Sequence, residues 1–195
     1  MTWVGSVAVS PLKRLRIAAT TVSALAVGLV TMATRREAGD RVELAVGDIA
    51  PDFELPGSDG RTYRLADYRG SHVVVIAWFP KAFTGGCTAE CESLGRSSST
   101  IRGAHGRVFG ASVDRLEVNR RFAETMGIDY PILSDTNKAV ARLYGVLGAS
   151  GFAERWTFYI GLDGRIVEID RHVRAVSHGK DVAARLERLG ISRQA

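Results

Sequence analysis

Cysteine is scarce in this chain, and of its 195 residues only Cys87 and Cys91 carry a thiol. A structural zinc site needs four ligands, and neither a second cysteine pair nor a histidine-rich cluster accompanies these two, which excludes that class of site. A disulfide stabilises more when it closes a longer loop, so a bridge across a four-residue step would stabilise the fold little. Redox chemistry and a metal site built from two thiolates both remain open.

The chain also has no internal repeats, no low-complexity tract and no strong excess of one charge. The formal net charge is +5, but Lys13, Arg14 and Arg16 supply three of these charges, which leaves a small positive excess elsewhere. A positive excess this small does not predict nucleic-acid binding. With 46% hydrophobic and 24% charged residues, the composition is that of an ordinary globular domain with an appendage.

The amino-terminal segment has the layout of an export signal. The basic cluster Lys13-Arg14-Leu15-Arg16 precedes an uncharged stretch, residues 17–34. As a helix, these residues would span about 27 Å, close to the roughly 30 Å of a membrane's hydrocarbon core. A secretory signal has the same order of charged and apolar residues. We therefore predict an exported or membrane-anchored protein of the cell envelope; a cytosolic extension is the alternative. The predicted parts are a hydrophobic signal or anchor helix (1–34), a linker (35–46) and one domain (47–195).

Both cysteines follow a segment with the pattern of a buried strand. The run from Val73 to Phe79 is short, uncharged and rich in β-branched residues, which is typical of a strand covered on both faces. Pro80 ends the strand because it cannot donate to a ladder, and Gly85-Gly86 give the backbone freedom for a sharp turn. The following residues predict a helix from Cys87 to about Ile101, with Cys87 in its first turn.

A thiol in the first turn of a helix meets unpaired N–H groups and the positive end of the helix dipole, which favour the thiolate. Because the thiolate is the nucleophile, this position predicts a reactive Cys87. The glycine turn and the polar neighbours predict that the two cysteines are not fully buried. Two inert core cysteines are the structural alternative.

Strand-like and helix-like segments alternate along the rest of the chain. We predict strands at 53–55, 62–64, 108–113, 132–133, 155–160 and 165–171, and helices at 116–126, 138–144 and 179–189. Such alternation is typical of an α/β sheet covered on both faces.

The segment around the first cysteine resembles a known active site. Pro80, Thr84 and Cys87 fit the Pro-x-x-x-Thr-x-x-Cys motif of the peroxiredoxins, and residues 86–90 resemble the Gly-Cys-Thr-x-Glu stretch of their Q, or bacterioferritin-comigratory, subtype. The resemblance covers about residues 43–190; other similar segments are 47–53, 65–70, 108–114, 130–135 and 155–160. It implies a thioredoxin-like fold, with a central mixed sheet flanked by helices. It also implies a thiol-dependent peroxidase that reduces hydrogen peroxide and organic hydroperoxides.

The resemblance also implies roles for the site residues. Cys87 would attack the O–O bond, and the hydroxyl of Thr84, the N–H of Cys87 and the guanidinium of Arg155 would stabilise the developing negative charge. Pro80 would shield the thiolate from water and over-oxidation. Glu90 would orient Arg155 through a charge-assisted bond; its alternative is an exposed first-turn carboxylate that supports the helix dipole.

Cys91 is the internal candidate for the next step, in which the sulfenic acid on Cys87 condenses with a thiol to a disulfide. In the common pattern of this subtype the second cysteine lies five residues after the first, whereas here it lies four residues after Cys87. The usual Thr-Pro-Gly-Cys is also replaced by Thr84-Gly85-Gly86-Cys87. Cβ atoms four apart in a helix are about 5–6 Å apart, but a disulfide needs roughly 3.5–4.5 Å. The first turn must therefore unwind.

The resemblance further implies the partners of the reaction. They are a hydroperoxide as substrate and a thioredoxin or similar dithiol as reductant, with no bound cofactor or metal. The chain is expected to be a monomer or weak homodimer.

The Sco-type copper chaperones give a rival interpretation of the Cys-x-x-x-Cys pair, because soft thiolates bind Cu(I). Those proteins place a histidine just before the strand that corresponds to Thr157–Ile160, where this chain has Glu154-Arg155, and a guanidinium cannot ligate copper. The chain's four histidines are predicted to be surface or strand-edge residues: His72, His105, His172 and His178. A membrane-tethered disulfide reductase, the third possibility, would require Cys-x-x-Cys.

Overall fold

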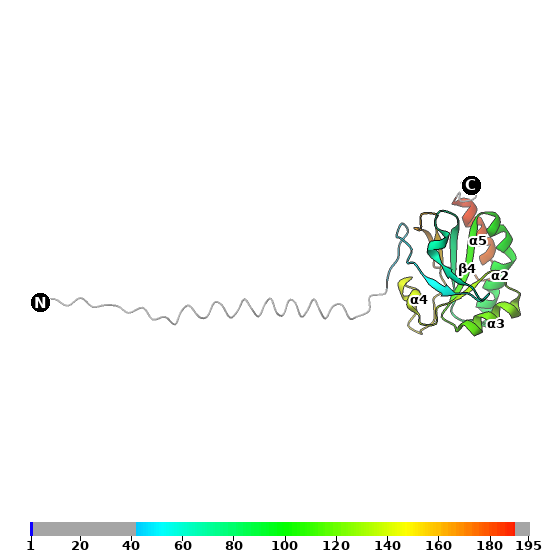
Figure 1. Ribbon diagram of the computed structural model, residues 1–195, viewed down its shortest axis with the longest axis horizontal. Coiled ribbons are helices and arrows are strands. Elements are labelled where there is room, and N and C mark those ends of the chain that lie inside the picture. Colours follow the sequence, from blue (N-terminus) through cyan, green and yellow to red (C-terminus); the bar gives the residue numbers. More distant parts are fainter. Residues whose placement is uncertain (2–41, 190–195) are drawn as a thin grey trace. The chain divides into compact units, whose positions relative to one another are not determined.

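A five-stranded mixed sheet forms the centre of the described structure (Figure 1). The computed structural model describes residue 1 and residues 42–189. The strands are β3 (Val73–Trp78), β4 (Gly106–Ser112), β5 (Ile132–Ser134), β6 (Thr157–Ile160) and β7 (Ile166–Asp170), in the order β5-β4-β3-β6-β7. β3, β4 and β5 are parallel, whereas β6 and β7 are antiparallel to their neighbours.

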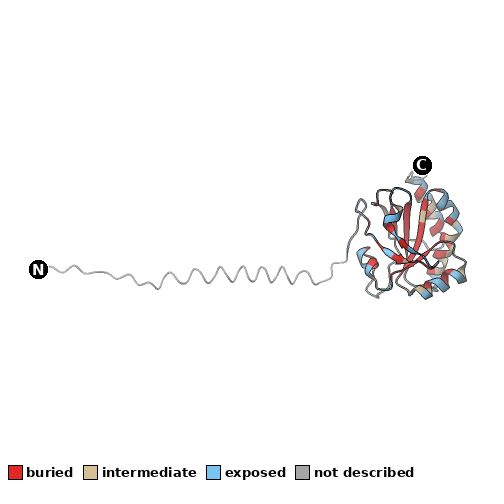
Figure 2. Cartoon of the chain, viewed as in Figure 1, coloured by how far each residue is buried: buried red, intermediate tan, exposed pale blue. Residues whose placement is uncertain are grey.

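The central strand, β3, is buried along its whole length, as are most residues of the central sheet (Figure 2). Because side chains alternate along a strand, Val74, Ile76 and Trp78 enter one core, while Val73, Val75 and Ala77 enter the other. This two-sided burial explains why the strand contains no polar residue.

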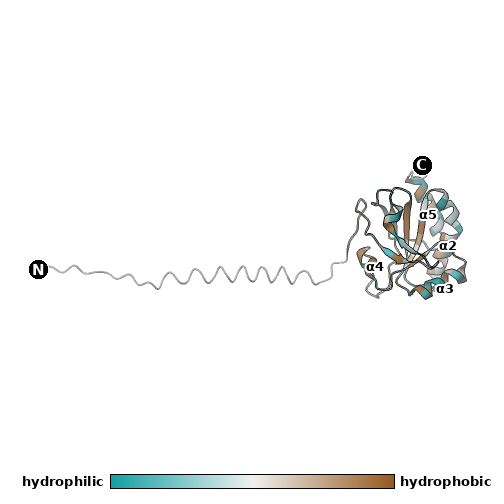
Figure 3. Cartoon of the chain, in the orientation of Figure 1, coloured by the Kyte–Doolittle hydropathy of each residue, from teal (hydrophilic) through white to brown (hydrophobic). Residues whose placement is uncertain are grey.

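Three helices cover one face of the sheet: α2 (Gly85–Gly103), α3 (Leu116–Met126) and α5 (His178–Arg188). The hairpin of β1 (Glu54–Pro56) and β2 (Thr62–Arg64), the 3-10 turn η2 (Leu65–Tyr68) and α4 (Ala139–Leu143) supply the core on the other face. Figure 1 shows α2, α3 and α5 together on one side of β4 and α4 on the other. Helices α2, α3 and α5 contain many hydrophilic residues, whereas α4 is mainly hydrophobic (Figure 3).

The predicted elements are present, with shifts of one or two residues at most of their ends. The strand 62–64 and the helix 116–126 have the predicted limits. The helix that carries the cysteines begins at Gly85 rather than Cys87 and continues to Gly103, because Leu94, Ser98 and Ile101 bury one of its faces despite weak helix propensity. The α/β sheet covered on both faces is therefore confirmed.

The predicted hydrophobic helix within residues 1–34 lies outside the described residues, and the structure adds no support for it. Among the described residues, no helix is both long enough and apolar enough to span a membrane.

Candidate active site

Cys87 is the third residue of α2, and its side chain belongs to the same core as Ala77 of the central strand. Thr84 is the N-cap residue, and the first intrahelical bond is donated by the N–H of Thr88 to the carbonyl of Thr84. The N–H of Cys87 therefore belongs to the unpaired first turn, where the helix dipole is positive. The prediction that Cys87 lies in a first helical turn is confirmed.

The turn before α2 is built differently from the prediction. Gly85 and Gly86 are ordinary helical residues, and the left-handed residue of the turn is Phe83, with φ 61°. The N–H of Ala82 donates to Oδ2 of Asp114 at 2.8 Å, which ties the turn to the end of β4. Tertiary contacts, rather than glycine flexibility, therefore hold this turn.

Arg155 lies two residues before β6 and reaches the start of α2. Its Nη2 is 3.2 Å from Sγ of Cys87, and its Nη1 pairs with Oε2 of Glu90. A Cβ atom at Gly86 would lie 3.2 Å from Nη2, so the missing side chain leaves room for the guanidinium. Burial lowers the pKa of Arg155, but Glu90 and Cys87 outweigh this effect and the pKa is raised. The cation is thus held between two acidic groups.

Glu90 is completely buried, so the alternative of an exposed first-turn carboxylate is wrong. Residues 87, 90, 91 and 94 lie on one helical face because they are three or four apart, and this face packs on the sheet. An ion pair at such a site is costly to break, because the remaining charge would stay buried.

Thr84 and Pro80 belong to the segment that connects β3 to α2. Thr84 is exposed, and its hydroxyl donates to the carbonyl of Lys81 at 2.9 Å. The hydroxyl proton of Thr84 is therefore used in this hydrogen bond, whereas the hydroxyl oxygen can still accept one. This differs from the predicted role of Thr84 as a donor. Pro80 is half-buried. The structure brings Cys87, Glu90 and Arg155 into contact.

Cys91 lies one turn after Cys87, and both thiols are free. The prediction that the cysteines are not fully buried is wrong: Cys87 is 1% exposed and Cys91 is 0% exposed. Polar neighbours did not indicate exposure here, because Glu90 and Ser93 are themselves buried. Burial raises the pKa of the Cys91 thiol well above its usual value, so Cys91 is a protonated, poorly nucleophilic thiol while the helix is intact.

Comparison with known proteins decides the family. The sequence model of the AhpC/TSA family matches residues 46–169. The chain belongs to the AhpC/TSA family. It is 34% identical to peroxiredoxin Bcp of Escherichia coli K12 over 142 residues, which is 69% of this chain and 90% of that protein.

Two solved structures of peroxiredoxins have the same fold. Peroxidoxin BcpB of Mycobacterium tuberculosis matches with a TM-score of 0.69 and 30% identity, covering 75% of this chain and 99% of that one. The bacterioferritin comigratory protein of Xanthomonas campestris, whose structure was described for its alkyl peroxide reduction activity, matches with a TM-score of 0.68 and 27% identity over 77% and 99% of the two chains. This AhpC/TSA member is thus a Q-type peroxiredoxin, a thiol-dependent peroxidase with a thioredoxin-like fold.

The copper-chaperone alternative finds no support among these relatives. Within residues 42–189, no group of three or more histidine, cysteine or acidic side chains comes together in a way that could hold a metal ion. The domain limits at residues 34 and 46 stay predictions.

His178 is the site residue of this peroxiredoxin that the sequence reasoning missed. His72, His105 and His172 are exposed, as predicted, but His178 is fully buried at the start of α5. Its Nδ1 lies 3.1 Å from Oε1 of Glu90. Gly179, which follows it, could have indicated a close helix contact, but only if the partner helix were known.

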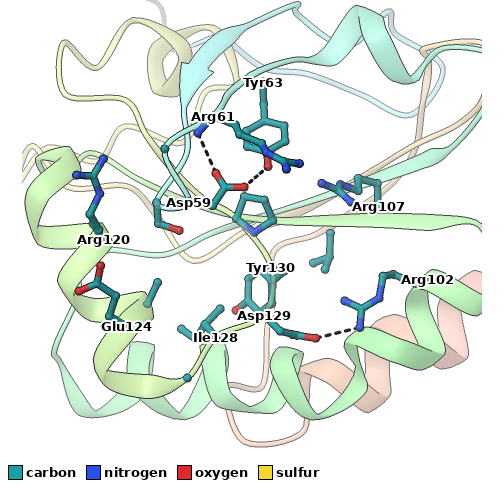
Figure 4. A pocket seen from close by; sticks show the side chains of 16 residues that line it. Asp59, Arg61, Tyr63, Arg102, Arg107, Arg120, Glu124, Ile128, Asp129 and Tyr130 are labelled. Carbon is teal, nitrogen blue, oxygen red and sulfur yellow. Dashed lines mark hydrogen bonds and ion pairs between the residues drawn. The ribbon is translucent and has the colours of Figure 1, made fainter.

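A separate cavity is lined by other residues than Cys87 and its neighbours in α2. It has a volume of about 750 Å³ and is surrounded by four arginines and three carboxylates (Figure 4). These are Arg61, Arg102, Arg107, Arg120, Asp59, Glu124 and Asp129. Tyr130 lines the cavity and connects it to α2, since its hydroxyl lies 3.1 Å from the carbonyl oxygen of Cys91.

Proposed function

We propose that the enzyme reduces hydroperoxides, alkyl hydroperoxides included, with Cys87 as the peroxidatic nucleophile. The observation that carries this assignment is the 3.2 Å contact between Nη2 of Arg155 and Sγ of Cys87. A guanidinium stays charged under all physiological conditions and has fixed donors. It therefore favours the thiolate before the reaction and can stabilise the leaving oxygen during it.

The first step forms an S–O bond and breaks the O–O bond. The Cys87 thiolate attacks one peroxide oxygen, the other oxygen leaves as an alkoxide or hydroxide and takes up a proton, and sulfur is left as a sulfenic acid. The N–H of Cys87 and the guanidinium of Arg155 would donate to the oxygens. Thr84, whose proton bonds to Lys81, would accept the O–H of the incoming hydroperoxide.

In the second step the sulfenic acid would condense with Cys91 to a disulfide and release water. The two cysteines belong to one continuous helix, and four-apart positions are too distant for a disulfide. The start of α2 must therefore unwind, which also exposes Cys91 and removes the burial that keeps it protonated. A thioredoxin-like dithiol would then exchange with the disulfide, become oxidised itself and restore both thiols.

The place of action and the assembly are also proposals. The basic cluster and apolar stretch in residues 13–34 favour an exported or membrane-anchored enzyme, which would act as a monomer or weak homodimer. Cell fractionation of the full chain and light scattering of the domain can test these two proposals.

Peroxide consumption by the reduced domain, with thioredoxin as reductant, tests the function. Cys87→Ser should abolish turnover. Cys91→Ser should keep one stoichiometric reaction with peroxide and lose recycling. Equal single-turnover reaction in both variants would remove Cys87 from its role, whereas full recycling in Cys91→Ser would show a one-cysteine enzyme.

A further inference from the structure

A buried polar chain continues behind the peroxide site. Glu90 uses Oε2 for Arg155, and its second oxygen, Oε1, faces Nδ1 of His178. The other ring nitrogen of His178, Nε2, lies 2.9 Å from Oγ1 of Thr157. Glu90, His178 and Thr157 each have an exposed fraction of 0%. The chain therefore runs from Thr157 on β6 to the sulfur without a water-exposed link before Arg155.

Glu90 and His178 depend on each other for partners. Oε1 and Nδ1 lie 3.1 Å apart, but the angle is not that of a well-aligned hydrogen bond. Neither atom has a hydrogen-bond partner among residues 42–189. A buried carboxylate oxygen or ring nitrogen without a partner is costly. One tautomer matches both neighbours of the ring, with the proton on Nδ1 facing Oε1 and Nε2 accepting from the hydroxyl of Thr157.

The backbone is built to bring His178 to this place. A Cβ atom at Gly179 would lie 1.9 Å from the carbonyl oxygen of Ser93, so only glycine allows α5 to approach α2 this closely. The N–H of Gly179 also donates to Oγ of Ser93 at 3.0 Å. The start of α5 is thus fixed against α2 one turn beyond Glu90.

We propose that His178 is a positioning residue of the peroxide site, a role that rests on the function proposed above. Its Nδ1 proton holds Oε1 of Glu90, which keeps Oε2 directed at Arg155 and so keeps the guanidinium on Sγ of Cys87. Without this donor, the carboxylate of Glu90 can rotate or take up a proton, and Arg155 loses its anchor.

Two amide variants separate this role from simple packing. In His178→Asn the amide nitrogen takes the place of Nδ1 and can donate to Glu90. In His178→Gln the amide takes the place of Nε2, near Thr157, and leaves Oε1 of Glu90 without a donor. Both variants are polar, and both remove the aromatic ring, so a merely structural role predicts equal effects.

Two rates are measured on the reduced protein: peroxide reduction in a single turnover, and alkylation of Cys87 by iodoacetamide in a Cys91→Ser background. We expect His178→Gln to slow both by about 10-fold to 100-fold, as small displacements of a catalytic group do, whereas His178→Asn keeps most of both rates. Val182→Ala, at a buried apolar position of α5 in the hydrophobic core, is the packing control. It should lower the melting temperature without slowing either rate.

Equal rates in the two amide variants, or losses that follow the melting temperature across all three variants, would overturn the proposal. If the amide variants do not fold, Thr157→Val provides the test, because it removes the hydrogen bond that holds the ring of His178. This variant should slow both rates several-fold. Unchanged rates would overturn the proposal. A wild-type protein that consumes no peroxide would contradict the proposed function, while the alkylation rates would still decide the role of His178.

Discussion

The hydroxyl of Tyr130 donates to the carbonyl oxygen of Cys91 across 3.1 Å, and both residues are buried. Tyr130 comes from the segment before β5, and Cys91 from the second turn of α2. This bond stabilises the intact helix, in which the two cysteines cannot bridge. It therefore opposes disulfide formation but has no part in the attack on peroxide.

Tyr130→Phe should speed disulfide formation after a single oxidation. The expected gain is about 2-fold to 10-fold, because one hydrogen bond contributes about 0.5–1.5 kcal/mol. Rapid quench and mass spectrometry of the alkylated products give the rate. Tyr144→Phe is the matched control, since that buried hydroxyl bonds to the carbonyl of Pro51 in the other core. A slower or unchanged rate in Tyr130→Phe would show that the bond does not limit the opening of α2.

Arg155→Ala should slow the peroxide step by about 100-fold to 1,000-fold, the usual cost of removing one transition-state donor. Arg155→Lys should recover only part of the rate, because an ammonium lacks the fork that contacts both Glu90 and Cys87. Stopped-flow single-turnover measurements can test this. Near-normal kinetics in a folded Arg155→Ala protein would contradict the assigned role.

The two glycines before Cys87 form a matched pair for testing the placement of Arg155. A methyl group at position 86 would lie 3.2 Å from Nη2 of Arg155, whereas at Gly85 no atom lies within 4 Å. Gly86→Ala should therefore slow the peroxide step several-fold by displacing the guanidinium. Gly85→Ala should leave that rate unchanged and stabilise α2 by about 0.5–1 kcal/mol. Equal kinetics in the two variants would indicate that Arg155 moves freely.

The raised pKa of Cys91 predicts a loss of stability in alkali. In the unfolded chain this thiol titrates at about pH 8.5, but in the folded state burial keeps it protonated. The contribution of this thiol to the free energy of unfolding is therefore complete below pH 8.5. Above that pH it declines by about 1.4 kcal/mol per pH unit. Urea unfolding of the reduced protein at pH 7.5 and 9.5 should show a larger drop for the wild type than for Cys91→Ala. An equal drop in both proteins would assign the effect to other groups.

Much of this structure follows from local patterns, and the differences come from contacts between distant segments. The β-branched run that forms β3 and the periodic helix α3 could be predicted because their own residues determine them. The left-handed backbone of Phe83 could not be predicted, because it depends on distant residues. The ring of Phe83 packs on Phe122, with 5.0 Å between the ring centroids, and the N–H of the neighbouring Ala82 donates to Asp114.

The candidate site shows the same division. The motif identified Pro80, Thr84 and Cys87, and the resemblance of the strand identified Arg155. The burial of Glu90 and the approach of His178 depend on how α5 packs on α2, two helices separated by four strands in the sequence. No local pattern carries that information, because a histidine at a helix start has the same sequence signal whether it is exposed or buried.

The contact between Gly179 and Ser93 determines how much of α2 can open. Residues 85–92 precede the contact and can open once Glu90 leaves His178, whereas the rest of the helix is fixed to α5 at Ser93. In the disulfide form, amide hydrogen exchange should therefore accelerate before Ser93 while β3 stays protected. Unchanged exchange at residues 85–92 with the disulfide confirmed would contradict this opening.

The same contact should also determine how fast the start of α2 re-forms after the disulfide is reduced. Starting a new helix is unfavourable, with a nucleation constant of about 10⁻³, whereas adding residues to an existing helix takes about a nanosecond each. Because the segment after Ser93 stays helical, it serves as a preformed nucleus. Once a reductant has restored the thiols, the first two turns should regrow on this nucleus, so that refolding adds little to the time of the cycle.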